Sequence, residues 1–148
     1  MPDVREKAVA LLARREHSRR ELHTKLKRRG FPIELIDQAL DWLAENDLQC
    51  DERYAEAYTH SRRSRGFGPL RILSDLRDRG VASSLIDSVV QASDIAWADE
   101  AVSTRARKFG DVLPEGIEER ARQSRFLARR GFSAEHVRTA LRRDIRGG

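Results

Sequence analysis

The chain carries one short pattern three times, and this internal repeat constrains its fold more than any other feature. Each copy has leucine, any two residues, arginine, glycine and then an apolar residue. The copies stand at 26–31 ("LKRRGF"), 76–81 ("LRDRGV") and 127–132 ("LARRGF"), with their glycines 50 and then 51 residues apart. The apolar match continues downstream at Ile36, Ile86 and Val137 and at Leu40, Val90 and Leu141. A repeat of this length predicts three structural units in series.

Apolar residues recur at helical spacing along the chain, as at Ala8, Leu11 and Leu12. No segment alternates apolar and polar residues for long enough to predict a strand. We expect an all-α fold of about nine helices, near residues 3–16, 18–29, 32–46, 51–65, 69–79, 83–92, 94–109, 115–130 and 133–144. Grouped by the repeat, they form three three-helix domains at 1–48, 49–93 and 94–148. Units this short are expected to support one another.

Several residues are typical of helix starts. Ser18 and Glu21 have the spacing of a capping box, in which each side chain accepts a hydrogen bond from an exposed backbone N–H group. Proline near the first helical position costs no hydrogen bond, which suits Pro69 and Pro114. Further N-caps are expected at Asp51, Ser93 and Ser133.

The repeated pattern itself fits the end of a helix. If Gly30 follows the last helical residues in the left-handed conformation, Leu26 and Phe31 are the apolar pair of a Schellman motif. The same assignment pairs Leu76 with Val81 and Leu127 with Phe132. The arginine before each glycine then faces the negative end of the helix dipole. A phosphate cradle would use a helix N-terminus instead, and the chain has neither GxxxxGK[ST] nor GxGxxG.

Charge alternates along the chain in blocks that follow the repeat. Overall, 29 Lys and Arg stand against 24 Asp and Glu, a formal net charge of +5, and 36% of residues are charged. Basic against acidic residues number eight to two over 14–30, one to eight over 31–61, six to two over 62–80, none to four over 81–104 and nine to two over 120–146. Stacked units would therefore bring the basic second helices together.

We call these basic positions the basic stripe. They are Arg19, Arg20, Lys25, Lys27, Arg28, Arg29, Arg62, Arg63, Arg65, Arg71, Arg77, Arg79, Arg122, Arg125, Arg129 and Arg130. A positive stripe on a helical array suits a phosphate backbone, and its affinity should fall steeply with salt. The competing interpretation is that opposite charges only bridge adjacent units, where surface pairs contribute little individually.

No catalytic or metal-binding constellation is predicted. The histidines, at positions 17, 23, 60 and 136, are scattered and form no HExxH motif or Cys/His cluster. Asp47, Asp51 and Glu52 lie close in sequence, but helix capping explains Asp51 and Glu52 without a metal. The single cysteine, Cys50, has no disulfide or CxxC partner. We expect a binding protein with no cofactor, and no enzyme.

The sequence also indicates where the protein works. No stretch approaches the roughly 18 consecutive apolar residues of a membrane span, and the N-terminal residues lack the apolar core of a signal peptide. We expect a cytoplasmic protein. Trp42 and Trp97 lie near the expected unit boundaries and are interpreted as core anchors.

Three stretches resemble one bacterial family, the RecX regulators of the RecA recombinase. They are "ALLARREHSRRELHTKLKRRGF" at 10–31, "DERYAEAYTHSRRSRGFGPLRILSDLRDRGV" at 51–81 and "RFLARRGFSAEHVRTAL" at 125–141. The resemblance covers nearly the whole chain. The run Arg-Arg-Glu-His-Ser-Arg-x-Glu-Leu, together with Asp-Glu-Arg-Tyr-Ala and Gly-x-Gly-Pro, makes it specific.

This resemblance implies three tandem three-helix repeats, each similar to a helix-turn-helix, in an elongated curved body. It implies a monomeric regulator that binds the RecA filament on single-stranded DNA and lies along the groove of the filament. Such proteins usually suppress the ATPase, strand-exchange and coprotease activities of RecA in DNA repair and the SOS response. Weak nonspecific DNA binding by the chain alone is also expected. The family has no agreed catalytic residues, so its functional surface corresponds here to the basic stripe.

Two points stay open. Gln123 stands where Leu22 and Ile72 stand in the earlier repeats, so the third repeat is expected to pack differently and its alignment with the stripe is open. The alternative function is an autonomous DNA-binding protein in which one second or third helix reads a groove. Protection of a defined duplex by the protein alone would favour that alternative.

Overall fold

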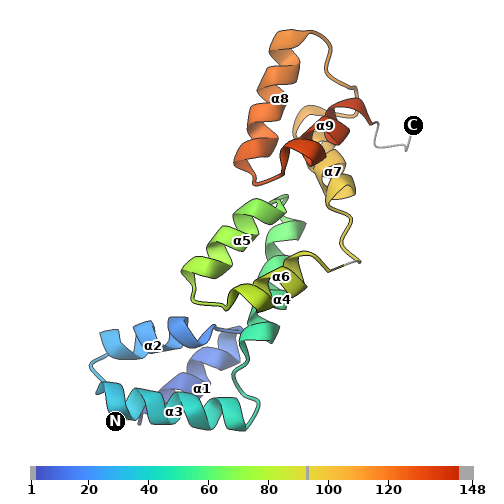
Figure 1. Ribbon diagram of the computed structural model, residues 1–148. Helices are drawn as coiled ribbons and strands as arrows, with labels where there is room; N and C mark the ends of the chain where they lie inside the picture. The colour runs from blue at the N-terminus through green and yellow to red at the C-terminus, as the bar shows by residue number, and fades with distance from the viewer. Residues whose placement is uncertain (1–2, 93, 144–148) are drawn as a thin grey trace. The chain divides into compact units, whose positions relative to one another are not determined.

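In the computed structural model, which describes residues 3–92 and 94–143, all regular structure is helical (Figure 1). The helices of this described part are α1 (Val4–Arg14), α2 (Arg19–Arg28), α3 (Ile33–Glu45), α4 (Asp51–Ser64), α5 (Pro69–Asp78), α6 (Ser83–Val90), α7 (Trp97–Phe109), α8 (Ile117–Arg129) and α9 (Ala134–Arg142). The predicted all-α fold of three-helix repeats is confirmed. The largest boundary difference is at α7, which begins at Trp97 rather than near residue 94. None of these helices combines the length and apolar character needed to cross a membrane.

The described residues pack into two compact units. The first unit contains the residues up to Tyr58 together with Leu76–Val89. The second unit contains Thr59–Asp75 together with the described residues from Val90 onward. Packing thus divides α4 and α5 between the units, whereas the boundaries predicted from the repeat fall between helices. Those repeat boundaries stay a prediction.

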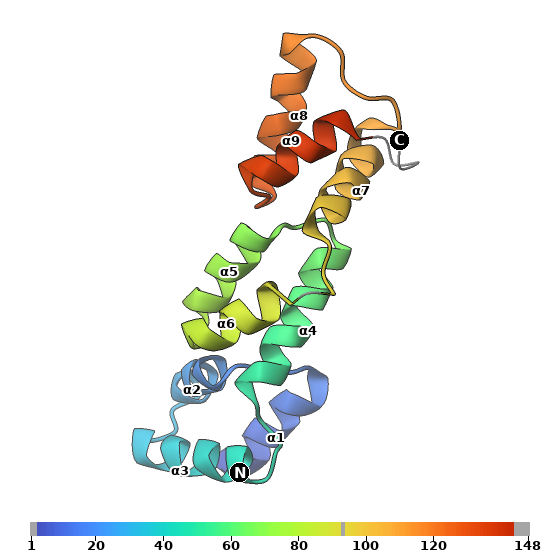
Figure 2. The same ribbon diagram turned by 45° about the vertical axis from the view of Figure 1, so that its right-hand side comes forward.

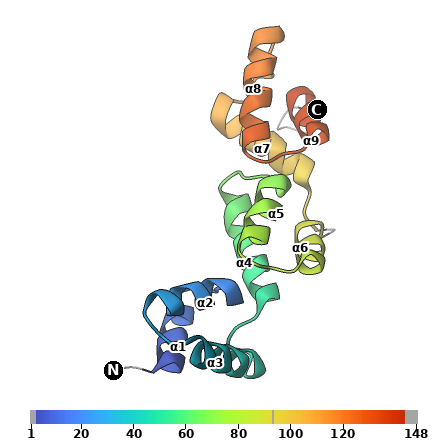
Figure 3. The ribbon, with the colours of Figure 1, turned by 60° about the vertical axis from the view of Figure 1, so that its left-hand side comes forward.

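The core of the first unit lies between α1, α2 and α3, which pack against one another (Figure 3). Its fully or nearly fully buried members are Ala8, Leu11, Leu22, Leu26, Ile36, Leu40 and Leu43. Trp42 packs against this cluster as predicted, and the Arg5 guanidinium lies 4.0 Å from the centre of its ring. An arginine over an indole face is a favourable cation–π contact.

In the second unit, α9 packs against both α7 and α8 (Figure 2). Trp97 is buried there, and its Nε1 donates a hydrogen bond to the Val90 carbonyl at 2.8 Å. This core also holds polar groups, because Gln123 and Arg105 are both buried. Gln123 is buried as Leu22 and Ile72 are at the equivalent positions of the other repeats. Its Nε2 donates a hydrogen bond to Glu119 Oε1 at 2.9 Å.

The helix starts follow the predictions in part. Ser18 and Glu21 form the predicted capping box, with both hydrogen bonds at 3.1 Å, and Ser133 caps α9 by accepting from His136 N at 3.3 Å. Pro69 is the first residue of α5, as predicted. The prediction for Pro114 was wrong, because α8 begins at Ile117 after Gly116. The predicted cap Ser93 lies outside the described residues.

Asp51 caps a different helix from the one predicted. It is the first residue of α4, and its Oδ1 accepts hydrogen bonds from Arg19 N at 2.9 Å and Gln49 Nε2 at 2.8 Å. Arg19 is the first residue of α2, whose N–H has no partner within its own helix. The carboxylate therefore joins the start of α2 to the start of α4.

The predicted Schellman stops are present in all three copies of the pattern. In the first, Phe31 N donates to Leu26 O at 3.3 Å and Gly30 N to Lys27 O at 3.0 Å. The equivalent bonds end α5 at Gly80 and α8 at Gly131, and all three glycines have positive φ. A fourth stop of the same type ends α4, where Phe67 N donates to Arg62 O at 3.0 Å. Here the Arg62 guanidinium lies 5.2 Å from the centre of the Phe67 ring, so a cation–π contact replaces the usual apolar pair.

Candidate functional site

The repeated helix end has a second role in the first unit, because the end of α5 meets the start of α2. Ser18 Oγ donates a hydrogen bond to the Arg79 carbonyl at 2.8 Å while it accepts from Glu21 N. The Arg20 side chain lies against Gly80, where an added Cβ would be 2.7 Å from Arg20 Nε. The Ser18 hydroxyl thus bonds to an N–H at the start of α2 and to a carbonyl at the end of α5, two kinds of backbone group that a helix leaves without a partner.

A corresponding junction lies in the second unit, between the start of α5 and the end of α8. Gly68 N donates to Arg130 O at 2.7 Å, and Leu70 N donates to Gly131 O at 2.9 Å. A Cβ on Gly68 would lie 2.6 Å from backbone atoms of Gly131 and Phe132. Gly68 stands 50 residues after Ser18, which is the repeat spacing, so equivalent positions make both junctions.

The first copy of the pattern has no such neighbour. A Cβ placed on Gly30 would meet no described atom within 4 Å. Lys27, Arg28 and Arg29, at this end of α2, are all exposed. The same local sequence therefore ends three helices, but at Gly30 it leaves its basic side chains open to a partner.

Some residues of the predicted basic stripe are held by contacts within their own unit. Arg19 Nη2 lies 2.7 Å from Asp41 Oδ1, and Arg79 lies 3.9 Å from Glu21 Oε2 and stacks over the Tyr58 ring at 4.7 Å. In the second unit, the stripe residues that pair with carboxylates are Arg63 with Glu100, Arg71 with Asp75 and Arg122 with Glu119. Of these arginines, Arg63 and Arg79 pair with carboxylates of another predicted repeat, as the competing interpretation of the charge pattern expects. The pairs of Arg19, Arg71 and Arg122 lie within one repeat and do not bridge units.

Arg20 is exposed, but its Nη1 donates to the Asp78 carbonyl at 3.4 Å. Other stripe residues are exposed, and their side chains make no ion pair or hydrogen bond within the part of the chain that the structure describes. We call them the exposed cations: Lys27, Arg28, Arg29 and Arg77 in the first unit, and Arg65, Arg125 and Arg129 in the second. Lysine and arginine side chains of this kind suit a polyanion or an acidic protein surface. Their alignment into one continuous stripe stays a prediction.

Lys25, another predicted stripe residue, is half-buried and belongs to a hydrogen-bond network around the buried His17, which precedes α2. Its Nζ lies 2.8 Å from His17 Nε2, and His17 Nδ1 lies 3.0 Å from the Arg15 carbonyl. Burial lowers the pKa of His17, and the nearby charges of Arg15 and Lys25 lower it further. Burial raises the pKa of Glu21, but the hydrogen bonds from Arg15 and from Ser18 N–H outweigh it, so that pKa lies below its ordinary value.

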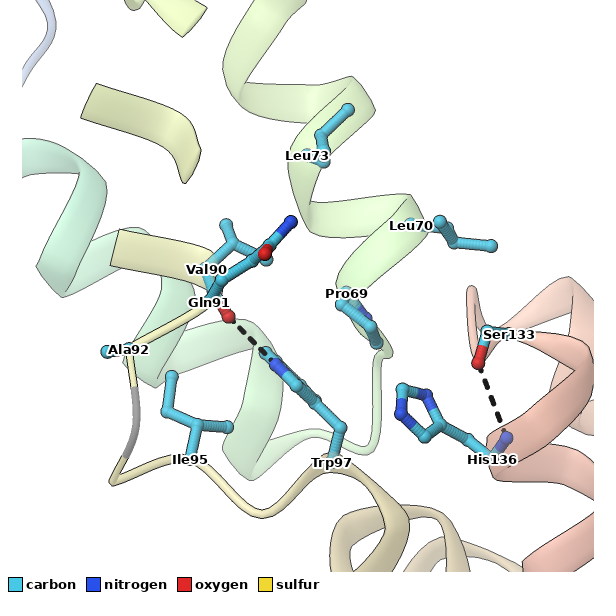
Figure 4. A pocket seen from close by; sticks show the side chains of 10 residues that line it. All are labelled: Pro69, Leu70, Leu73, Val90, Gln91, Ala92, Ile95, Trp97, Ser133 and His136. Atoms are coloured by element: carbon cyan, nitrogen blue, oxygen red, sulfur yellow. Dashed lines mark hydrogen bonds between the residues drawn. The ribbon is translucent and has the colours of Figure 1, made fainter. Parts of the chain in front are cut away.

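A mainly apolar pocket of about 410 Å³ lies in the second unit (Figure 4). The residues that line it are Pro69, Leu70, Leu73, Val90, Gln91, Ala92, Ile95, Trp97, Ser133 and His136. The Trp97 ring lines the pocket and is held there by its hydrogen bond to Val90 O. His136 Nδ1 is buried and has no hydrogen-bond partner among the described residues. Of these lining residues only His136 is titratable, so the pocket does not combine an acid and a base for catalysis.

Within the described residues, no three His, Cys, Asp or Glu side chains come together in a way that could hold a metal ion. The histidines predicted to be scattered have unrelated roles. His17 is in the hydrogen-bond network and His136 lines the apolar pocket, while His23 Nε2 lies 3.7 Å from Asp37 Oδ1.

Two cations that the charge blocks did not include lie beside the stripe. Arg107 and Lys108, at the end of α7, line a basic pocket together with Arg65 and Arg130. Both residues lie in the last turn of α7, where basic side chains interact favourably with the helix dipole, and this position was visible in the sequence. It was missed because residues 105–119 carry both charge signs and no repeated pattern.

Comparison with family models and known proteins gives a consistent result. Residues 5–43, 51–90 and 98–141 match models described as the first, second and third three-helix domains of RecX. A "Regulatory protein RecX" from Halorhodospira halophila is 47% identical over 137 residues, covering 93% of this chain and 85% of that protein. Another, from Ectopseudomonas mendocina, is 47% identical over 139 residues, covering 94% and 93%.

A solved structure supports the fold. The crystal structure of RecX from Lactobacillus salivarius superposes with a TM-score of 0.77 at 20% identity, covering 93% of this chain and 92% of that one.

Proposed function

The chain belongs to the RecX family of regulatory proteins, and on that premise we propose that it binds the RecA nucleoprotein filament and inhibits RecA. The activities affected are ATP hydrolysis, strand exchange and the coprotease function, in DNA repair and the SOS response. The family is one of regulators and not of enzymes. A binding role therefore agrees with both the family and the residues.

The observation that carries this proposal is the group of exposed cations. Lys27, Arg28 and Arg29 are exposed at a helix end where a Cβ on Gly30 would meet no described atom within 4 Å. Arg77 is exposed in the same unit. Unpaired surface cations gain most from a phosphate backbone, since each neutralised phosphate releases counterions. The filament supplies such phosphates on its single-stranded DNA.

The mechanism we propose is steric. The repeats lie along the filament groove and contact successive RecA subunits, and the exposed cations face DNA phosphate or acidic protein surface. The acidic helices face basic protein surface nearby. A body that bridges subunits resists the movements that accompany ATP turnover. The protein acts as a monomer in the cytoplasm, and its own binding to DNA is weak and nonspecific.

A titration of RecA ATPase activity on single-stranded DNA tests the proposal. Added protein is expected to lower the hydrolysis rate in a saturable way, with weaker inhibition at higher salt. Unchanged hydrolysis and unchanged filament lifetime would reject the regulatory function. In parallel, protection of a defined duplex by the protein alone would instead identify an autonomous DNA-binding protein.

A further inference from the structure

The second unit contains a basic pocket of about 260 Å³ at the ends of α4, α7 and α8. Its charged lining consists of Arg65, Arg107, Lys108 and Arg130, and its remaining lining of Gly66, Thr104 and Phe126. No carboxylate is among these residues. Four cations of one sign around one small space repel one another, and a bound anion would relieve that repulsion.

Contacts to the protein hold several of these cations in place. Arg107 Nη1 donates to the Ser64 carbonyl at 3.5 Å, and Arg130 Nη1 donates to the Arg65 carbonyl at 3.2 Å. Lys108 Nζ lies 5.6 Å and the Arg130 guanidinium carbon 5.1 Å from the centre of the Phe126 ring. The charges are therefore largely positioned before a ligand arrives, which lowers the entropy cost of binding.

Thr104 gives a second and independent indication of a ligand. It is 5% exposed and lines the pocket, and its Oγ1 has no hydrogen-bond partner among the described residues. A buried hydroxyl without a partner is destabilising, and native structures rarely retain one without a reason. Gly66 leaves the space beside this buried hydroxyl unfilled, since a Cβ there would lie 3.3 Å from Thr104 Oγ1 and 3.5 Å from Arg107 Nη2.

We propose that the basic pocket binds one phosphate group. Thr104 Oγ1 donates a hydrogen bond to a phosphate oxygen, while the guanidinium and ammonium groups neutralise its charge. The phosphate belongs to the backbone of a single nucleic-acid strand. That choice of source rests on the proposed function, whereas the affinity of the pocket for phosphate does not. Neither Arg107 nor Lys108 belongs to the predicted basic stripe, so this site extends the binding surface onto α7.

Two variants and one matched control test the pocket without RecA. Thr104→Val removes the hydroxyl at nearly constant shape, and Arg107→Gln with Lys108→Gln removes two charges at exposed positions. The control, Arg138→Gln with Arg142→Gln, removes two exposed charges from α9, outside the pocket and the stripe. Binding of a fluorescent oligothymidylate is followed by anisotropy over a range of salt concentrations, and binding of inorganic phosphate by NMR shifts.

Thr104→Val is expected to unfold at the same or a higher temperature than the parent chain, because it replaces an unpaired buried hydroxyl with a methyl group. It should nevertheless weaken oligonucleotide binding about tenfold, the loss typical of a hydrogen bond to a charged group. The double pocket variant should also lower the slope of log affinity against log salt by about 0.7, as expected for one lost phosphate contact on a single strand. The control should keep more of its affinity than the pocket variant.

Equal loss in the control and pocket variants would overturn the proposal, since only net charge would then matter. An oligonucleotide affinity and phosphate shifts that are both unchanged in Thr104→Val would also overturn it. Phosphate shifts that vanish in Thr104→Val while oligonucleotide binding persists would support the phosphate site and reject the nucleic-acid source. All these measurements use the chain alone, so their failure is distinguishable from a failure to inhibit RecA.

Discussion

The two junctions at the repeated helix end use the same position of the repeat in different ways. In the first unit, Ser18 reaches the Arg79 carbonyl through its hydroxyl at 2.8 Å. In the second, Gly68 has no side chain, and its main-chain N–H reaches the Arg130 carbonyl directly at 2.7 Å. A serine can join two helix ends with one side chain, whereas a glycine lets the two backbones approach.

Gly30 supplies the third case, in which an added Cβ would meet no described atom within 4 Å. The comparison shows that Leu-x-x-Arg-Gly-apolar determines only where a helix ends. What the end then does depends on the segment that meets it. Arg79 and Arg130 are held in junctions, while Arg29 is exposed. The candidate partner surface is the first copy of the motif, at the end of α2, which makes no junction with another helix end among the described residues.

The largest effect is expected from Gly68→Ala, which adds a Cβ about 2.6 Å from the backbone of Gly131 and Phe132. We expect a loss of about 3 to 5 kcal/mol from overpacking and weakened main-chain hydrogen bonds, measured by urea unfolding. Gly30→Ala is the control, because it adds only left-handed backbone strain of about 1 to 2 kcal/mol. If Gly68→Ala lowers the free energy of unfolding by no more than Gly30→Ala does, the close approach of Gly68 to the backbone of Gly131 and Phe132 is refuted.

A smaller effect is expected from Ser18→Ala. This change removes both the cap of α2 and the bond to the Arg79 carbonyl, for a loss of about 2 kcal/mol. Ser133→Ala removes a cap alone and should lose about 1 kcal/mol. Thermal unfolding gives the loss of unfolding free energy in each variant, and the difference between the two losses is the contribution of the hydrogen bond to the Arg79 carbonyl. Equal losses would show that this hydrogen bond contributes nothing.

The smallest effect is expected from pH. Because the pKa of His17 is lowered in the folded chain, the unfolded chain takes up the proton first as pH falls. Stability should therefore decline as pH falls below 6.5, the ordinary histidine value, and the loss is complete once the folded-state pKa is passed. Urea midpoints between pH 7.5 and about 5.5 measure this, and His17→Gln should flatten that part of the profile. An unchanged profile in the variant would assign the dependence to other groups.

The sequence predicted the features that depend on neighbouring residues. Helix ends at Gly30, Gly80 and Gly131 follow from the spacing of glycine and two apolar residues, and the Ser18 capping box follows from a four-residue run. The helix end before Gly66 was predicted to within one residue, but its Schellman motif was not recognised, because Arg62 stands where the pattern has leucine and its contact with the Phe67 ring replaces an apolar pair.

The features that depend on long-range contacts could not be predicted in this way. Nothing in the run around Asp51 indicates that its carboxylate caps α2 rather than α4. Likewise, charge counting placed Arg79 and Arg28 in one stripe, although Glu21 and Tyr58 hold Arg79 and no described ion pair holds Arg28. Burial and partners separate the two arginines, and both depend on the folded chain.

The most direct test of the account is the affinity of this protein for RecA filaments on single-stranded DNA when the exposed cations are reversed. Arg28→Glu with Arg29→Glu changes exposed groups at the open end of α2, and Arg138→Glu with Arg142→Glu is a control of equal charge change on α9. We predict a loss of affinity of about tenfold or more for the first variant, a much smaller loss for the control, and unchanged helical content in both. Equal affinities of the first variant and the parent chain, or equal losses in the two variants, would contradict the claim that this surface recognises the filament.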